Sequence, residues 1–357
     1  MEILAPFDGI EQIPLLAKAE ATELYCGYIP LDWVEEYNRK LPNLNPYKLQ
    51  ISLNRRESHH ANLTSYPALK AAIDQAHHLG LPVYVTVNAP FYPAENYPYI
   101  LDYVKAIVEA GADGMMIADP GLMWAVRELG VRIKVVLSTC TQVANKSANR
   151  FFKELGVTRI TFPRHVSLAE VAAITQHTPD LEYECFVLEG RCTYDDGHCH
   201  TLHCGGSICN EEWLPGFFKL NGQALSFSEG QRLARHHESY RDYINPWPND
   251  RVNCNGWRNM GCGICAIPYL LEHTHITALK VAGRGIDNLQ KLKSIFILSR
   301  ALKMASEGSS GREIKEMAQA NLQPYPELCE IGYRCYFPDG RALYQDVRYR
   351  SKKTCKS

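Results

Sequence analysis

The chain has 357 residues, with 38 Lys and Arg against 39 Asp and Glu and a formal net charge of −1. This length suits one large domain with an appendage, or two domains, and it can bury a sizeable core. The near-zero charge excludes a basic groove or an acidic tail that dominates the whole chain, but it leaves room for a local basic pocket that binds RNA.

The N-terminus and the hydropathy pattern predict a protein without a membrane partner. The first residues, MEILAPFDGIEQIP, lack the positive stretch followed by an apolar stretch that marks a signal peptide. The sequence also has no apolar run of the roughly 18 residues that a membrane helix needs. We therefore expect a cytoplasmic protein.

In chain order, short apolar stretches alternate with longer amphipathic ones. Strands are predicted at 2–7, 23–28, 48–54, 81–88, 113–119, 132–139, 158–163 and 181–188, and helices at 10–20, 67–80, 99–111, 121–130, 145–156 and 167–178. Parallel strands need crossovers of this kind. The alternation predicts an α/β fold, a TIM-like (β/α)8 barrel rather than an open doubly wound sheet. No GxGxxG follows the first strand, which argues against dinucleotide binding.

After Gly190 this alternation stops and the composition changes. The next stretch is rich in Gly, Cys, His, Asn, Trp and Pro, and barrel-like sequence with a helix at 288–308 follows it. We predict a barrel formed by 1–189 and 266–309, a cysteine-rich metal-binding insertion at 190–265, and a small C-terminal extension at 310–357.

Polar residues follow several of the predicted strands. In a TIM-type barrel these positions lie at the C-terminal mouth, where active sites are built. Arginine suits a carboxylate or phosphate through paired donors, and His165 and Glu189 are the candidate catalytic acid–base groups. The candidate substrate-binding residues are Asn54, Asn88, Arg164 and Arg284. Helix capping and turn formation are the alternative explanation for such residues, for Asp119 especially.

Thirteen cysteines are many for a chain in a reducing compartment, and seven of them fall between Cys192 and Cys265. Clustered cysteines there more often bind metal or react than form disulfides. Four thiolates are the usual set for zinc or for an iron–sulfur cluster. Structural zinc favours C-x2-C pairs, a spacing that Cys262 and Cys265 have. Cys192 and Cys199, with six residues between them, suit a cluster wrapped by a loop.

Six segments, in the same order, resemble the sequence of the peptidase U32 family, also called collagenase-like proteases. The stretch at 184–199, ECFVLEGRCTYDDGHC, is similar to the family signature of Glu, Phe two residues on, and then Cys-x4-Gly-x-Cys. The other segments lie at 77–88, 110–130, 137–171, 262–270 and 278–285. The resemblance therefore spans most of the chain.

This resemblance implies a cofactor and a class of chemistry. Several members of the family are iron–sulfur proteins that support oxygen-independent hydroxylation in ubiquinone synthesis, or hydroxylation of tRNA and ribosomal RNA bases. By similarity, a 4Fe–4S cluster would be held by Cys192, Cys199, Cys209 and Cys262, with Cys254 and Cys265 as alternates. The implied function is an enzyme that carries out oxygen-independent redox chemistry, as hydroxylation or sulfur or oxygen transfer, on a small molecule or nucleobase.

Several mouth positions depart from the family pattern. The family's Phe-Val-His-Gly has Glu189 in this chain, its Arg-Glu-Leu-Ser has His165, and its Ser-Thr-Gln ends in Cys140. Its Lys-x-Glu-Gly-Arg has Ala282 in place of Glu. The resemblance thus implies that the cluster is kept and that the substrate differs from the familiar ones.

Three other functions stay open. Zinc bound by HCHTLHC (198–204) with a water activated by Glu189 would give a hydrolase or peptidase. Cys140 as a nucleophile would need a histidine base nearby. A binding module could use the apolar WLPGFF (213–218) as an interface if it is exposed. The expected partners are a small-molecule or nucleobase substrate, an electron donor, and a second subunit of the same or another kind.

Overall fold

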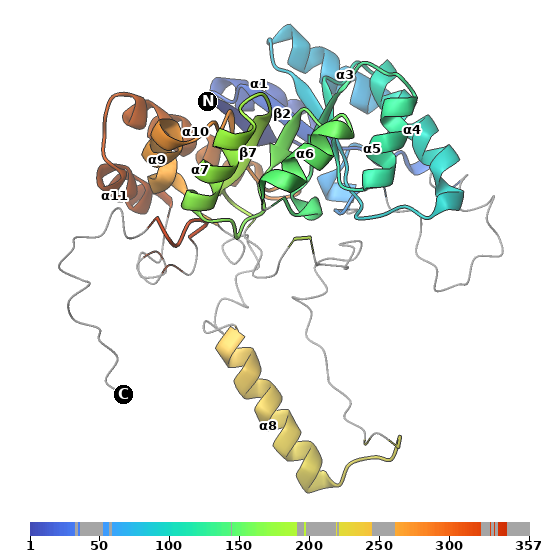
Figure 1. The fold of residues 1–357 in the computed structure, drawn as a ribbon, viewed down its shortest axis with the longest axis vertical. Coiled ribbons are helices and arrows are strands. Elements are labelled where there is room, and N and C mark those ends of the chain that lie inside the picture. Colours follow the sequence, from blue (N-terminus) through green and yellow to red (C-terminus); the bar gives the residue numbers. More distant parts are fainter. Residues whose placement is uncertain are drawn as a thin grey trace.

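The computed structural model describes residues 1–32, 35, 53–56, 59–143, 145–190, 196–197, 219, 221–244, 261–322, 329, 332 and 335–340. In this part of the chain, eight parallel strands form a closed barrel in which each strand pairs with its neighbours in sequence order (Figure 1). The predicted TIM-like (β/α)8 barrel is confirmed.

The strands are short and mostly buried. Their bounds are β1 (Glu2–Pro6), β2 (Glu23–Gly27), β3 (Val83–Val87), β4 (Gly114–Ile117), β5 (Lys134–Leu137), β6 (Arg159–Thr161), β7 (Glu182–Leu188) and β8 (Ala278–Val281). β3 reads VYVTV and is buried at every residue. Such a continuous apolar run is typical of a parallel strand that is covered on both faces.

The strand predicted at 48–54 is wrong where the structure describes it. Leu53 and Asn54 lie in a bend, and 48–52 lie outside the described residues. Asn54 is fully buried, and its side-chain Nδ2 donates to Asn62 Oδ1 at 3.0 Å. The eighth strand is instead β8, which follows the cysteine-rich region. Leu53 and Asn54 are therefore buried in a bend and not in a strand.

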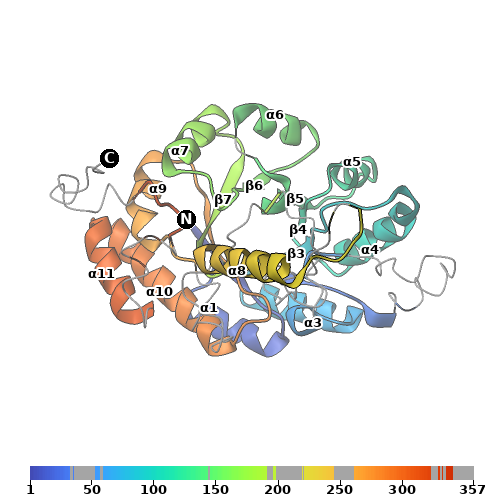
Figure 2. The same ribbon diagram turned by 90° about the horizontal axis from the view of Figure 1, so that it is seen from below.

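Helices surround the barrel on its outside (Figure 2). Their bounds are α1 (Ile13–Lys18), α3 (Tyr66–His78), α4 (Tyr97–Glu109), α5 (Pro120–Glu128), α6 (Lys146–Glu154), α7 (Leu168–His177), α9 (Ile267–His273), α10 (Asn288–Ser306) and α11 (Gly311–Leu322). Ser167 and Glu170 form a capping box at the start of α7. The Asp119 side chain caps α5 by accepting a hydrogen bond from Leu122 N, which confirms the helix-capping explanation for this residue.

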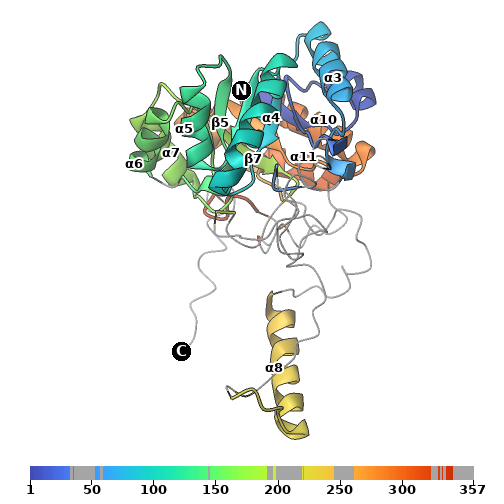
Figure 3. The ribbon, with the colours of Figure 1, turned by 90° about the vertical axis from the view of Figure 1, so that its right-hand side faces the viewer.

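Five short 3-10 helices complete the described elements. Their bounds are η1 (Ile10–Gln12), η2 (His59–Ala61), η3 (Ala94–Asn96), η4 (Thr139–Thr141) and η8 (Ile264–Ala266). The helix α8 (Phe227–Ile244) lies apart from the barrel (Figures 1 and 3). None of the helices that the structure describes is long and apolar enough to cross a membrane.

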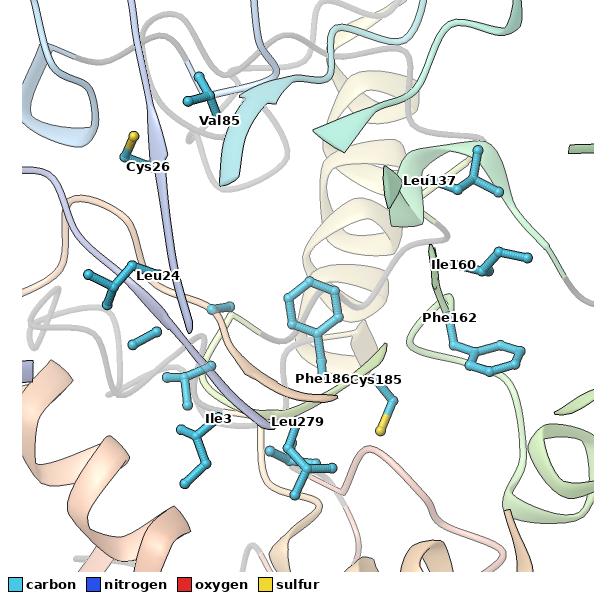
Figure 4. Packing of buried hydrophobic residues seen from close by; sticks show 14 of the residues in the cluster. Ile3, Leu24, Cys26, Val85, Leu137, Ile160, Phe162, Cys185, Phe186 and Leu279 are labelled. Atoms are coloured by element: carbon cyan, nitrogen blue, oxygen red, sulfur yellow. The ribbon is translucent and has the colours of Figure 1, made fainter. Parts of the chain in front are cut away.

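Two apolar layers hold the barrel together. The larger lies between the strands and the helices, and Figure 4 shows Ile3, Val85 and Leu279 among its members. Successive residues of a strand point to opposite faces, as Cys185 and Phe186 do on β7 (Figure 4). The smaller cluster consists of Leu4, Tyr25, Tyr84, Met116 and Val136, which alternate with outward-facing neighbours and fill the inside of the barrel.

The inside of the barrel also holds charged residues. Arg159 on β6 reaches across to Glu23 on β2, with its two terminal nitrogens 2.6 and 2.9 Å from the carboxylate oxygens. It also contacts Glu182 at 2.7 Å. The Arg159 and Glu23 side chains are almost fully buried. Buried charges of this kind are tolerated only when they are paired.

The predicted division into barrel, insertion and extension stays a prediction. Most of 190–265 lies outside the described residues, and so do all of WLPGFF at 213–218 and all of HCHTLHC at 198–204. Within the predicted C-terminal extension, α11 packs near α10, and Tyr336 and Phe337 are buried in the larger apolar layer.

Candidate functional site

Loops at the carboxyl ends of the strands meet in a hydrogen-bonded group at the barrel mouth. Asn88, after β3, accepts from Arg55 N at 3.2 Å and donates to Ser138 Oγ at 3.3 Å. The Arg55 guanidinium donates to Cys140 Sγ at 3.2 Å. The predicted substrate residue Asn88 thus connects loops that follow three different strands.

Asp196, from the Cys-x4-Gly-x-Cys signature, is bound in this mouth. Its Oδ2 accepts from Thr139 Oγ1 at 3.2 Å and forms an ion pair with Arg164. Its backbone carbonyl accepts from Arg55 NH1 at 2.8 Å. Asp196 is not among the residues that the sequence predicts for the site. Its partners are distant in the sequence and meet it only in the closed barrel.

Arg164, predicted to bind substrate, is half-buried against protein partners. Its guanidinium carbon lies 4.0 Å from the centroid of the Phe186 ring. Burial lowers the pKa of Arg164, but the charge of Asp196 and hydrogen bonds to Asp196 and Tyr336 raise it above the ordinary value. This arginine therefore stays charged and links the signature segment to the C-terminal part of the chain.

Tyr336 extends this set of contacts to Cys262. Its backbone N donates to Cys262 O at 2.9 Å, and its ring stacks on Phe186 with centroids 6.4 Å apart. Its hydroxyl donates to Glu189 O. A path of contacts consequently runs from Asp196 through Arg164 and Tyr336 to the backbone of Cys262.

The two candidate acid–base groups have different surroundings. Glu189 is buried, and its carboxylate accepts from Ser294 Oγ at 2.8 Å and from Gln290 Nε2 at 3.0 Å, both on α10. Its φ of 63° is unusual for a residue other than glycine, so these bonds help hold a strained turn after β7. His165 is exposed beside Arg164. Their catalytic roles stay predictions.

Arg284, after β8, contacts the loop between β2 and β3. It is 7% exposed and donates to Asn62 Oδ1 at 3.0 Å, the same oxygen that Asn54 binds. A Cβ at Gly27 would lie 1.9 Å from Arg284 NH1, so only glycine leaves room for this arrangement. Arg284 and nearby Arg56 form no ion pair with a carboxylate in the part of the chain that the structure describes.

Comparison with known proteins identifies the family. Residues 10–342 match the model of peptidase family U32. The chain belongs to this family.

Curated relatives of this U32 protein are RNA-modification proteins. It is 35% identical to tRNA hydroxylation protein P of Haemophilus influenzae over 153 residues, which are 43% of this chain and 31% of that protein. It is 26% identical to a 23S rRNA 5-hydroxycytidine synthase of Escherichia coli over 129 residues, 36% of this chain and 19% of that protein. The chain spans about a third of the length of the first relatives, at 31% and 32%. A solved U32 peptidase structure aligns at 16% identity with a TM-score of 0.38, covering 52% of this chain and 69% of that one.

Of the cysteines predicted to hold a cluster in this U32 protein, Cys262 is described. Cys192, Cys199, Cys209 and the alternate Cys254 lie outside the described residues. Burial raises the pKa of Cys262 well above its ordinary value, and the nearby thiols of Cys265, Cys329 and Cys335 act in the same direction. The described residues contain no group of three or more His, Cys, Asp or Glu that could hold a metal ion.

Two further residues of the U32 motifs meet inside the barrel. Lys280 Nζ lies 2.7 Å from Glu184 Oε1, 3.1 Å from Met116 Sδ and 4.6 Å from the Tyr25 ring centroid. Burial lowers the pKa of Lys280, although the charge of Glu184 acts against this shift. Both residues lie in the segments that resemble the family, and strand alternation would have placed them inside the barrel. Neither residue is among those that the sequence predicts for the site.

Proposed function

We propose that this U32 protein is a 4Fe–4S-dependent enzyme that carries out oxygen-independent hydroxylation of a base in RNA at its barrel mouth. The relatives are named for tRNA hydroxylation and for synthesis of a hydroxylated rRNA base. The observation that carries the proposal is the path of contacts from Asp196 through Arg164 and Tyr336 to Cys262.

This path supports a shared site for the predicted ligands. Asp196 comes four residues after Cys192 and three before Cys199. An extended chain spans at most about 3.6 Å per residue, so the Cα atoms of both cysteines lie within about 15 Å of that of Asp196. Thiolates are the ligands that iron–sulfur clusters require. The donor set of Cys192, Cys199, Cys209 and Cys262 therefore fits a 4Fe–4S cluster in type and number.

The mouth residues would bind and orient the RNA. When bound, the cluster supplies electron transfer, with a potential set by charge and hydrogen bonds around it. Arg284 and Arg56, which form no ion pair with a carboxylate in the described part of the chain, suit a phosphate group of RNA. Asn88 and Asn54 keep the loops around these arginines in place. His165 is the exposed member of the predicted acid–base pair.

Anaerobic purification with iron, sulfide and zinc analysis tests the cofactor. We expect about four irons and four sulfides per chain with broad absorption near 400 nm, and loss of iron from Cys→Ala variants at Cys192, Cys199, Cys209 and Cys262. Cys254→Ala and Cys265→Ala are the matched controls that should retain iron. Zinc without sulfide would contradict the proposal and favour the zinc hydrolase alternative.

Nucleoside analysis tests the substrate. RNA from cells with and without this protein would be digested and compared by mass spectrometry. We expect one hydroxylated nucleoside that disappears with the protein and returns with the wild-type chain, but not with the Cys192→Ala variant. Identical nucleosides in all samples, with iron present in the protein, would exclude RNA hydroxylation and leave a small-molecule substrate.

A further inference from the structure

The solvent-facing side of α10 is a stripe of cationic and apolar side chains. Between the two terminal residues of this helix, the exposed side chains are Leu289, Lys293, Phe296, Arg300 and Lys303. They recur every three or four positions, so they lie on one side of the helix over a length of about 21 Å. The opposite side of α10 is buried against the barrel. These five exposed residues are called the α10 stripe below.

The positive charge of the α10 stripe has no counter-charge in the described structure. α10 contains no Asp or Glu. The three cations of the stripe form no ion pair with any residue that the structure describes. Asp287 caps the start of the helix, Glu307 follows its end, and Glu20 accepts a hydrogen bond from Ser299 beside the stripe. The stripe therefore presents uncompensated positive charge to the solvent.

Two large apolar side chains are exposed together with these cations. Leu289 is 74% exposed and Phe296 is 59% exposed. Phe296 lies one helical turn from both Lys293 and Arg300, so its ring is flanked by two cations. Surfaces that bind single-stranded nucleic acid combine these two features, because the cations contact phosphates and the aromatic ring stacks on a base.

The α10 stripe begins next to the barrel mouth. Arg284 lies four residues before α10. Gln290 and Ser294 of α10 donate hydrogen bonds to Glu189, which follows β7, so the first turns of the helix are fixed to the mouth. From there α10 runs along the outside of the barrel next to α1 and α11 (Figure 2). A strand of RNA that reaches the mouth could therefore continue along the stripe.

We propose that the α10 stripe is a docking surface for RNA that flanks the base bound at the barrel mouth. Lys293, Arg300 and Lys303 would contact phosphates, and Phe296 would stack on an unpaired base. That RNA is the substrate rests on the proposed function. Phosphate contacts supply affinity and orientation but carry no sequence information. The stripe would thus position the RNA, and the mouth would select the base.

Two other occupants fit the stripe less well. A second copy of this chain, bound stripe to stripe, would bring its own three cations against these, and like charges across an interface repel. A helix that lies on a membrane buries a continuous apolar face in the lipid, whereas the apolar face of α10 packs on the barrel. The phosphates of RNA complement the charge of the stripe.

Fluorescence anisotropy with labelled, unfractionated tRNA tests the role of the cations in the full-length, cofactor-loaded chain. In the triple variant Lys293→Gln/Arg300→Gln/Lys303→Gln, we expect binding to be at least about tenfold weaker. The slope of log affinity against log salt concentration should become shallower by about two, because each phosphate contact to a single strand contributes about 0.7. An affinity and a slope equal to those of the wild type would overturn the proposal.

A second triple variant controls for the loss of net charge. Lys70→Gln/Lys105→Gln/Lys153→Gln removes the same charge from α3, α4 and α6, where each lysine is exposed and pairs with an aspartate. It should leave the affinity and the salt slope unchanged. If it weakens tRNA binding as much as the α10 variant does, the binding depends on overall charge, and the stripe is not the docking surface.

Phe296→Ala tests the stacking contact. Replacing an aromatic ring that stacks on a base should weaken tRNA binding by about fivefold or more. Phe151→Ala is the matched control, since Phe151 is 52% exposed on α6, and it should bind like the wild type. Equal effects of the two variants would contradict the stacking role. Wild-type protein that binds vesicles of phosphatidylserine and phosphatidylcholine but not tRNA would replace RNA by a membrane surface and overturn the proposal.

Nucleoside analysis separates this proposal from the proposed function. If the protein is needed for a hydroxylated nucleoside but the α10 triple variant binds tRNA normally, the docking surface is refuted and the proposed function stands. If RNA nucleosides do not depend on the protein but the α10 triple variant loses tRNA binding, hydroxylation is refuted and the docking surface stands.

Discussion

Lys280 on β8 forms a buried ion pair with Glu184 on β7, with 2.7 Å between Nζ and Oε1. Thr161 Oγ1 donates to the same carboxylate oxygen at 2.6 Å. Lys280 also lies between the rings of Tyr25 and Phe186, 4.6 and 5.4 Å from their centroids. The pair thus joins the charged inside of the barrel to the aromatic residues beneath its mouth.

Replacing Lys280 with methionine should destabilise the fold strongly. Lys280→Met leaves Glu184 buried without its closest counter-charge, and breaking a buried pair in this way costs about 3–5 kcal/mol. The double variant Lys280→Met/Glu184→Gln should recover part of this loss. Urea unfolding of the metal-free protein measures both. Lys105→Met is the matched control, because Lys105 pairs with Asp102 on the exposed face of α4, and it should change little. Equal stability of Lys280→Met and Lys105→Met would show that the barrel does not depend on this pair.

Adding one methyl group at Gly27 should disturb the mouth through Arg284. The new Cβ would lie 1.9 Å from both Arg284 NH1 and Asn62 Oδ1, so both side chains must move. We expect Gly27→Ala to lower stability by about 1–3 kcal/mol, the range for overpacking, and to weaken RNA binding. Thermal unfolding and fluorescence anisotropy measure the two effects. Gly230→Ala on α8 has nothing within 4 Å of its Cβ and should leave both unchanged or raise stability slightly.

Cys140 tests the alternative of a cysteine nucleophile. Arg55 NH1 lies 3.2 Å from its sulfur, and the thiol is buried at the mouth. If the chemistry depends on an iron–sulfur cluster, Cys140→Ser should keep full iron content and reduce hydroxylation by less than about tenfold, because it preserves size and a hydrogen-bonding group. Iron analysis and nucleoside quantification on the same preparation measure this. Complete loss of activity with intact iron would instead favour a reacting thiol.

Alkaline pH should destabilise the protein through buried thiols. Burial raises the pKa of Cys26 to about 12 from an ordinary 9.0, so the folded state keeps this proton while the unfolded state loses it. The stability that the thiol contributes is therefore complete below about pH 9 and is lost as the pH rises towards 12. One such group changes the free energy of unfolding by at most about 1.4 kcal/mol per pH unit.

The slope of stability against pH provides the measurement. Urea unfolding of the metal-free, reduced chain at several pH values above 9 gives this slope, and Cys26→Ala should make it less steep. Cys265 and Tyr28, with pKa values raised by burial to about 12, should account for part of the remainder. An identical slope in wild type and Cys26→Ala would mean that the Cys26 thiol is not protected in the folded state.

The sequence by itself determined those helices, strands and caps whose formation depends on residues close together in the chain. Alternation of apolar strands with amphipathic helices predicted the barrel, and Asp119 before Pro-Gly predicted a helix cap that the structure confirms. Such features follow from spacing and from side chains within a few positions of each other. The strand prediction was wrong at Leu53 and Asn54, which are buried like strand residues but lie in a bend.

The sequence also indicated which positions lie at the mouth, but the tertiary structure decided how they are paired. Asp196 meets Arg164, 32 positions away, and the Tyr336 hydroxyl reaches Glu189, 147 positions away. The chain had to close into a barrel before these partners could meet, because contacts across a closed sheet depend on strand order and register rather than on spacing in the sequence. For that reason the sequence by itself predicted which kinds of side chain lie at the mouth, whereas the fold decided that Asp196, Arg164 and Tyr336 meet there.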